Sequence, residues 1–110
     1  MSTKLLVILS TAEKEKALSG LLYTANALKR GWLPEVKVVF FGPFEKLLVE
    51  DKDVREKAAE VLGKVTPVAC KFISDNEGIS DDIRNLGFDV DFVGKIISDY
   101  LMEGYVPMVF

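Results

Sequence analysis

The chain has 110 residues, of which 49% are hydrophobic and 28% are charged, and its formal net charge is −3. This length predicts a single domain, residues 1–110, and this composition predicts an ordered globular protein. The small negative charge, with no basic block, argues against a nucleic-acid partner, because that affinity depends on neutralising phosphates. No apolar run approaches the length of a membrane span, so we expect no membrane partner.

The first strand and helix are indicated by a buried apolar run and a capping pattern. Leu5–Leu9 is continuously apolar, which is typical of a strand buried on both faces of a parallel sheet. The residues that follow resemble a capping box, with Ser10 as the N-cap and Glu13 at the third helical position. Gly31 is the predicted end of this helix. Val36–Phe41 is then expected to form the second strand.

The middle of the chain continues the alternation of helices and strands. Gly42-Pro43 ends the second strand, and a short helix is expected over Phe44–Val49. A further helix is predicted to begin with a cap at Asp53 and to end at Gly63. The third strand is expected over Val65–Ala69. A proline inside that segment lacks an N–H group, so the strand should be short, bulged or near an edge.

The C-terminal third has the same organisation, and the whole pattern defines a fold class. The expected elements are a short helix ending at Gly78, a helical turn over Ser80–Leu86, a strand over Phe88–Val93, a helix ending at Gly104, and a last strand over Tyr105–Phe110. Strands that alternate with helices predict an α/β three-layer α/β/α sandwich with a five-stranded, mostly parallel sheet.

Candidate site residues follow from that sheet, because ligands of parallel α/β folds bind outside the carboxyl ends of the strands. Ser10, Thr11, Gly42 and Cys70 all fall at such ends, and Lys71 follows directly. The hydroxyl groups could donate hydrogen bonds to a ligand, although helix capping also explains them. The glycine could shape a pocket, although turn geometry also accounts for it.

Cys70 is the only cysteine, and its neighbours place it between a strand and a helix. A helix N-terminus carries partial positive charge, which favours a thiolate over a thiol, and Lys71 would strengthen that bias. A thiolate is the nucleophile of sulfur chemistry, so Cys70 is a candidate catalytic residue. The alternative is a buried core thiol, because free cysteine is among the most buried residue types.

Several absences restrict the chemistry and the compartment. Histidine is absent, which removes the commonest general base and the commonest zinc ligand. No phosphate-binding or dinucleotide-binding glycine motif is present. The pairs Asp81-Asp82 and Asp89/Asp91 are interpreted as a helix cap and the solvent face of a strand, so we expect no cofactor and no metal. A single cysteine and the lack of a cleavable-signal pattern after Met1–Lys4 predict a cytoplasmic protein.

Motifs along nearly the whole chain resemble one known family. They are the strand Lys4–Leu9, the helix pattern Ala17-x4-Leu22-x2-Ala25-x5-Gly31, the segment Val68–Ile79 with its cysteine and its glycine, the pair Val93-Gly94, and the triplet Glu103-Gly104-Tyr105. In this order they are similar to the DsrE/DsrF/DsrH family, which includes the sulfur-relay proteins of the Tus type. The resemblance implies a five-stranded α/β/α fold, a cytoplasmic location and frequent oligomerisation.

The resemblance also implies a role for Cys70. It matches the cysteine that carries persulfide sulfur in active members, so the expected function is that of a sulfur carrier, a sulfurtransferase-type protein with sulfur-donor and sulfur-acceptor partners. A mechanism that uses two cysteines of one subunit is excluded. Because some relatives are partner subunits, the alternative is a non-catalytic oligomeric subunit or a small-ligand-binding module.

We also expect a homo-oligomer. The mean hydropathy of +0.21 is high for so small a soluble domain, which indicates that another subunit covers some apolar surface. The candidate contact segments are Phe40–Phe44 and Val106–Phe110.

Overall fold

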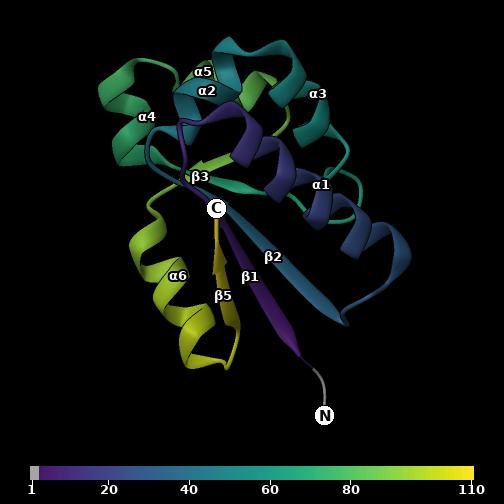
Figure 1. Cartoon of the computed structure of the whole chain (residues 1–110). Helices are drawn as coiled ribbons and strands as arrows, with labels where there is room; N and C mark the ends of the chain where they lie inside the picture. The colour runs from purple at the N-terminus through teal and green to yellow at the C-terminus, as the bar shows by residue number, and fades with distance from the viewer. Residues whose placement is uncertain (1–2) are drawn as a thin grey trace.

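Helices cover both faces of a parallel sheet, as the alternation of elements predicts (Figure 1). The computed structural model describes residues 3–110. Met1 and Ser2, which belong to the N-terminal segment considered for a signal, lie outside the described residues. The strands are β1 (Lys4–Leu9), β2 (Glu35–Phe40), β3 (Val68–Cys70), β4 (Asp89–Asp91) and β5 (Val106–Val109). They form one five-stranded sheet in the order β4-β3-β2-β1-β5, and every strand pair is parallel. The three-layer α/β/α class is therefore confirmed.

The connections between these strands are helical. The helices are α1 (Lys14–Arg30), α2 (Phe44–Glu50), α3 (Lys52–Ala59), α4 (Lys71–Glu77), α5 (Ser80–Asn85) and α6 (Val93–Met102). None of the helices within residues 3–110 is both long enough and apolar enough to cross a membrane.

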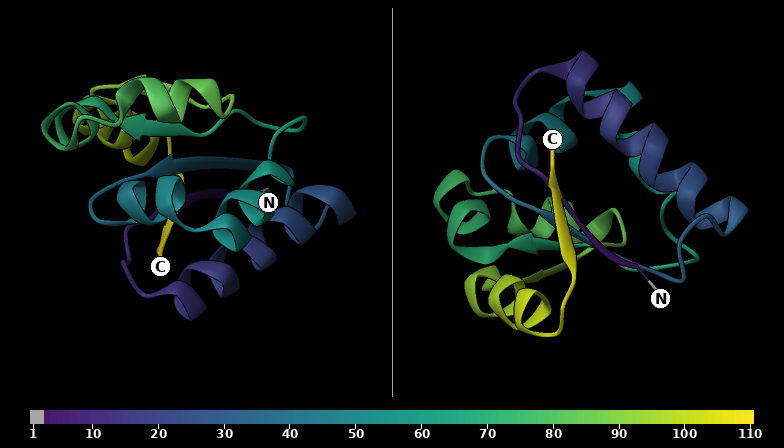
Figure 2. Two further views of the ribbon diagram at one scale, coloured as in Figure 1. Left: turned by 90° about the horizontal axis from the view of Figure 1, so that it is seen from above. Right: turned by 60° about the horizontal axis from the view of Figure 1, so that its bottom comes forward.

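Two apolar clusters fill the two sides of the sheet. The larger cluster joins one face of the sheet to α1, α2, α3 and α5. The smaller cluster contains Leu6, Val39, Cys70, Val93 and Tyr105, with residues of α6 packed against it. Figure 2 shows α1 and α6 on opposite sides of the strands. This separation arises because α6 carries the chain from β4 back across the sheet to β5.

The start of α1 differs from the expected capping box. The helix begins at Lys14, and its N-cap is Glu13, whose carboxylate accepts hydrogen bonds from the N–H groups of Glu15 (3.0 Å) and Lys16 (2.7 Å). The N–H of Glu13 itself donates to Oγ1 of Thr11 (3.0 Å). The assignment of Ser10 as the cap is wrong, because a carboxylate three residues later satisfies the free N–H groups of the first turn.

Other helix and strand boundaries also differ from the predicted ones, and the reasons are again local. The N-cap of α3 is Asp51 rather than Asp53, and its carboxylate accepts the N–H of Val54 at 3.0 Å. Strand β3 starts at Val68 instead of Val65. The segment before it contains Pro67, which has no N–H to give to the sheet. Strand β4 spans only three residues, because the chain turns into α6 at Val93.

The aromatic segment after β2 is divided between core and surface. Phe40 and Phe44 are fully buried, and the ring centroid of Phe40 lies 4.9 Å from that of Phe44 and 5.0 Å from that of Phe88. Phe41 between them is 39% exposed. Of these three rings, only that of Phe41 is therefore available to another subunit.

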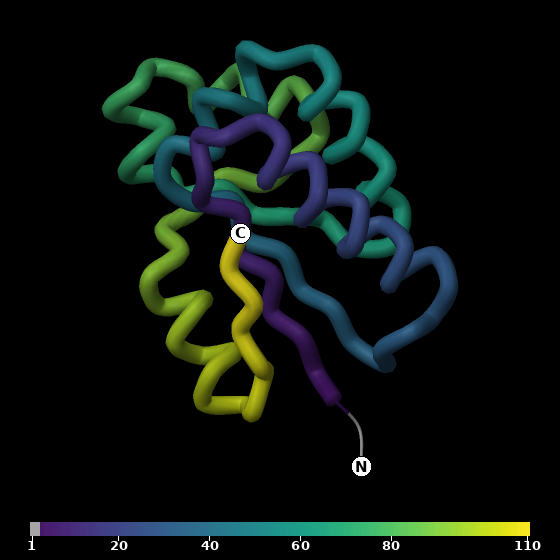
Figure 3. The backbone as a smooth tube through the Cα atoms, viewed as in Figure 1, coloured from purple at the N-terminus to yellow at the C-terminus, as the bar shows by residue number. Residues whose placement is uncertain are grey.

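Strand β5 forms one edge of the sheet beside β1, and its four residues are all exposed. Figure 3 shows the chain following β1 along this edge up to its C-terminal end. Phe110 packs on α1, because a Cβ atom at Gly20 would lie only 2.6 Å from its Cγ. The glycine therefore provides the space that this ring occupies.

Candidate functional site

The loops after β1 and β2 meet at the carboxyl edge of the sheet. Ser10 lies against Gly42, where an added Cβ would be 3.0 Å from the serine Oγ, and the N–H of Phe44 donates to the Ser10 carbonyl at 3.2 Å. The N–H groups of Ser10 and Thr11 both donate to the main-chain oxygen of Phe110, at 2.7 and 3.0 Å. Three of the predicted site residues are thus brought together. Main-chain hydrogen bonds join the loop after β1 to the start of α2 and to the C-terminal residue Phe110.

Gly42 has a structural reason for its identity. Its φ angle is +66°, in the left-handed region where residues with a Cβ are strained, and the same Cβ would press on Ser10. The tight turn between β2 and α2 therefore requires glycine at this position.

Cys70 lies where the sequence places it, between a strand and a helix. It is the last residue of β3 and the N-cap of α4, and its side chain makes no capping hydrogen bond. The residue is only 6% exposed and packs in the smaller apolar cluster. The thiol is therefore at the expected edge of the sheet but is covered by apolar side chains from the α6 face.

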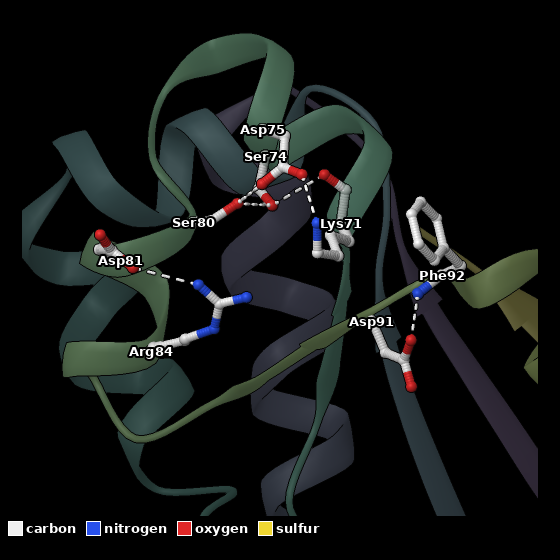
Figure 4. A network of polar contacts seen from close by, with 8 residues as sticks. All are labelled: Lys71, Ser74, Asp75, Ser80, Asp81, Arg84, Asp91 and Phe92. Carbon is white, nitrogen blue, oxygen red and sulfur yellow. Dashed lines mark hydrogen bonds and ion pairs between the residues drawn. The ribbon is translucent and has the colours of Figure 1, made fainter.

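The Lys71 ammonium group is engaged by its own helix rather than left free for the thiol. It donates to Oδ2 of Asp75 at 2.6 Å and lies 5.3 Å from the ring centroid of Phe92 (Figure 4). The hydrogen bond from Lys71, followed by one from Ser80, lowers the pKa of Asp75. The positive charge of Lys71, which was expected to favour a Cys70 thiolate, is thus paired with the Asp75 carboxylate one turn further along α4.

Hydroxyl groups connect α4 to α5 just beyond the cysteine. The Oγ atoms of Ser74 and Ser80 are 2.6 Å apart, and Ser80 also donates to the Asp75 carboxylate (Figure 4). Ser74 is fully buried and donates to the carbonyl of Lys71 at 3.3 Å. This network holds the first turns after Cys70 in a defined geometry.

Glu45, for which the sequence pattern predicts no role, is the most unusual polar residue at this edge. It lies in the first turn of α2 and is fully buried, and neither carboxyl oxygen has a regular hydrogen-bond partner within residues 3–110. Burial raises its pKa to about 8, and the backbone N–H of Cys70 offsets part of that rise. At this pKa the carboxyl group is mostly protonated at neutral pH.

A signal for this burial is present in the helical spacing. Phe44 and Leu48 form the buried stripe of α2, and Glu45 precedes Leu48 by three residues, on the same side of the helix.

A groove of about 490 Å³ opens beside the site, at the side of α2. Its lining residues are Ala12, Gly42, Pro43, Lys46, Leu47, Glu50, Ile73 and Glu77. Of the predicted site residues only Gly42 contributes to it. Ile73 of α4 lines the groove and also packs against the cluster that holds Cys70.

Comparisons with known proteins identify a similar fold of unassigned activity. No family model matches the chain, and no curated protein matches it. Among solved structures, the chain is similar to BT1422, a conserved protein of unknown function from Bacteroides thetaiotaomicron, with a TM-score of 0.88 and 29% sequence identity. The match covers 96% of this chain and 93% of that chain. The similarity supports the fold over nearly its whole length.

Proposed function

We propose that the protein is a cytoplasmic sulfur carrier that holds a persulfide on Cys70, as the resemblance to the DsrE/DsrF/DsrH family implies. The observation that supports this most directly is the position of the residue. Cys70 ends a strand at the carboxyl edge of a parallel sheet, where such folds bind their ligands, and its sulfur is not used for helix capping.

The transfer needs one cysteine in this chain and no external oxidant. The Cys70 thiolate attacks the outer sulfur of a donor persulfide, so that a new S–S bond forms at Cys70 and the donor S–S bond breaks. The donor leaves as a thiolate and takes up a proton from water. An acceptor thiolate then attacks the outer sulfur of the Cys70 persulfide. The S–S bond at Cys70 breaks, and Cys70 is released as a thiolate. Because Cys70 is 6% exposed, both steps require the apolar cover to move aside.

Sulfur loading is expected to depend on Cys70. After exposure of the reduced protein to inorganic polysulfide, intact mass should show a gain of one sulfur atom that added thiol removes, and Cys70→Ser should show none. Serine is nearly the same size, so the variant keeps the fold, which thermal unfolding checks. Equal gains in both proteins, or a wild-type thiol that reacts only in denaturant, would overturn the proposal.

A second candidate is a non-catalytic subunit or a small-ligand-binding module. The specific observations in its favour are the burial of Cys70 and the groove of about 490 Å³ beside α2. In that case Cys70→Ser and wild-type protein should behave alike toward polysulfide.

We also propose that the protein assembles with copies of itself through the edge formed by β5. Val106 (52% exposed), Met108 (40%) and Val109 (60%) are large apolar residues on this strand, and Met102 of α6 is 88% exposed. The N–H of Phe110 donates to β1, so by alternation residues 107 and 109 direct their backbone groups outward. Residue 107 is proline, which disfavours a continuous sheet between subunits, so the contact should be made by side chains.

Sedimentation velocity is expected to show a species larger than a monomer at micromolar concentration. Val109→Lys should shift it toward the monomer, because a buried, unpaired charge opposes association. The control is Glu56→Gln, at an exposed position on α3. A monomer at every concentration would contradict the assembly.

A further inference from the structure

The two most exposed phenylalanine side chains lie at the ends of the strand pair that carries Cys70. Phe72, in the first turn of α4, is 64% exposed, and Phe92, which follows β4, is 60% exposed. Strands β3 and β4 are neighbours, and Cys70 pairs with Asp91 at their carboxyl ends. Both phenylalanines therefore follow adjacent strands at the same edge of the sheet. Aromatic side chains are enriched in the contact surfaces of protein complexes.

The packing of the chain does not account for these two rings. Neither of them belongs to the two apolar clusters of the core, and within residues 3–110 neither stacks on another aromatic ring. The Lys71 ammonium group lies 5.3 Å from the centroid of the Phe92 ring (Figure 4). This ring thus already accommodates a cationic group.

The same part of the chain carries the net negative charge of the protein. Residues 71–92 contain six acidic and two basic side chains, so their net charge is −4, whereas that of the whole chain is −3. The two basic residues, Lys71 and Arg84, are each paired with an aspartate of their own helix. Asp89 and Asp91 of β4 are exposed, and no basic side chain within residues 3–110 forms an ion pair with either of them. Their charge is available to a partner.

We propose that Phe72, Phe92, Asp89 and Asp91 form a docking surface for a protein partner whose contact surface is basic. Lysine or arginine side chains of such a partner pair with the aspartates and lie against the exposed rings. Nucleic acids and anionic lipid surfaces are disfavoured, because both are negatively charged. The proposal deepens the proposed function and rests on it in one respect, which is that a partner docked beside Cys70 is the sulfur donor or acceptor.

The first experiment maps the surface without the sulfur chemistry. The probe is a short peptide of lysine residues around a central tryptophan, added to ¹⁵N-labelled Cys70→Ser, and the control peptide has glutamate in place of lysine. We expect the lysine peptide to shift amide resonances within residues 71–92 most strongly, and the shifts to weaken as added salt screens the charges. The control peptide should leave them unchanged. No shifts, shifts spread evenly over the chain, or equal shifts with both peptides would overturn the proposal.

Matched variants separate the aromatic from the charged contribution. The double variant Phe72→Ala, Phe92→Ala should weaken binding of the lysine peptide several-fold, whereas Leu22→Ala, at a position of α1 that is 50% exposed, should not. The double variant Asp89→Asn, Asp91→Asn should also bind several-fold more weakly and with less dependence on salt. Thermal unfolding checks that each variant is folded. An unchanged affinity in either double variant would contradict the docking surface.

A second copy of this chain is the alternative occupant of the same edge. Amide shifts within residues 71–92 that depend on protein concentration alone, without peptide, would assign the edge to a contact between copies and overturn the proposal. The outcome is also separable from the carrier function. Peptide binding at this edge without sulfur loading of Cys70 supports the docking surface and removes the persulfide, and sulfur loading without peptide binding has the opposite meaning.

Discussion

Glu45→Gln is expected to stabilise the protein increasingly as the pH rises from 4.5 to 8. In the folded chain the pKa of Glu45 is raised from 4.5 to about 8, chiefly by burial. Between these values the folded state holds a proton that the unfolded state has released, so the free energy of unfolding of wild type falls by about 1.4 kcal/mol per pH unit. The glutamine side chain has the same shape and does not titrate, so the variant escapes this loss.

The sign and the window of this effect are both testable by urea unfolding. The difference in unfolding free energy between the two proteins should be small near pH 4.5, grow to a few kcal/mol at pH 8, and level off above it, where Glu45 is ionised in both states. Glu56→Gln on the surface of α3 should differ from wild type by no more than about 0.5 kcal/mol at every pH. A Glu45→Gln difference that does not change with pH would show that the carboxyl group is not buried in its neutral form.

Phe40→Ala is expected to cost about 3–5 kcal/mol of unfolding free energy. The side chain is fully buried at the end of β2, between the rings of Phe44 and Phe88. Its removal leaves a cavity directly below the first turn of α2, which carries Glu45. Chemical denaturation of the variant measures the loss.

The adjacent aromatic residue is the matched control for this prediction. Phe41 is 39% exposed, so Phe41→Ala should cost less than about 1 kcal/mol. Similar losses in the two variants would contradict the division of this segment between core and surface. An effect of Phe41→Ala on sedimentation, without an effect on stability, would add this residue to the contact between subunits.

The local pattern was sufficient to predict most of the elements and the edge of the sheet on which the candidate site residues lie. The apolar run Leu5–Leu9 and the alternation that follows it identify strands and helices, and parallel connection then brings their carboxyl ends together. The position of Cys70 between β3 and α4 follows from the same reasoning. The boundaries that moved, at Glu13 and at Asp51, depended on which of several acidic or hydroxyl side chains caps a helix.

The chemical environment of the site depended on distant parts of the chain. Lys71 was expected to act on the thiol, but the geometry of α4 brings its ammonium group into an ion pair with Asp75. Glu45 was not expected at all, because an acidic residue in a short helix normally faces water. Only the packing of α2 against its neighbours buries it.

The fold class, the order of the elements and the placement of Cys70 at the end of a strand could thus be predicted from local patterns, since these features depend on periodicities and turn residues within short stretches of chain. The packing of distant elements, in contrast, covers the thiol from the α6 face and buries the Glu45 carboxyl group, which raises its pKa. Burial and the pKa shifts it causes arise from residues far apart in the chain, and no local pattern encodes which of them meet.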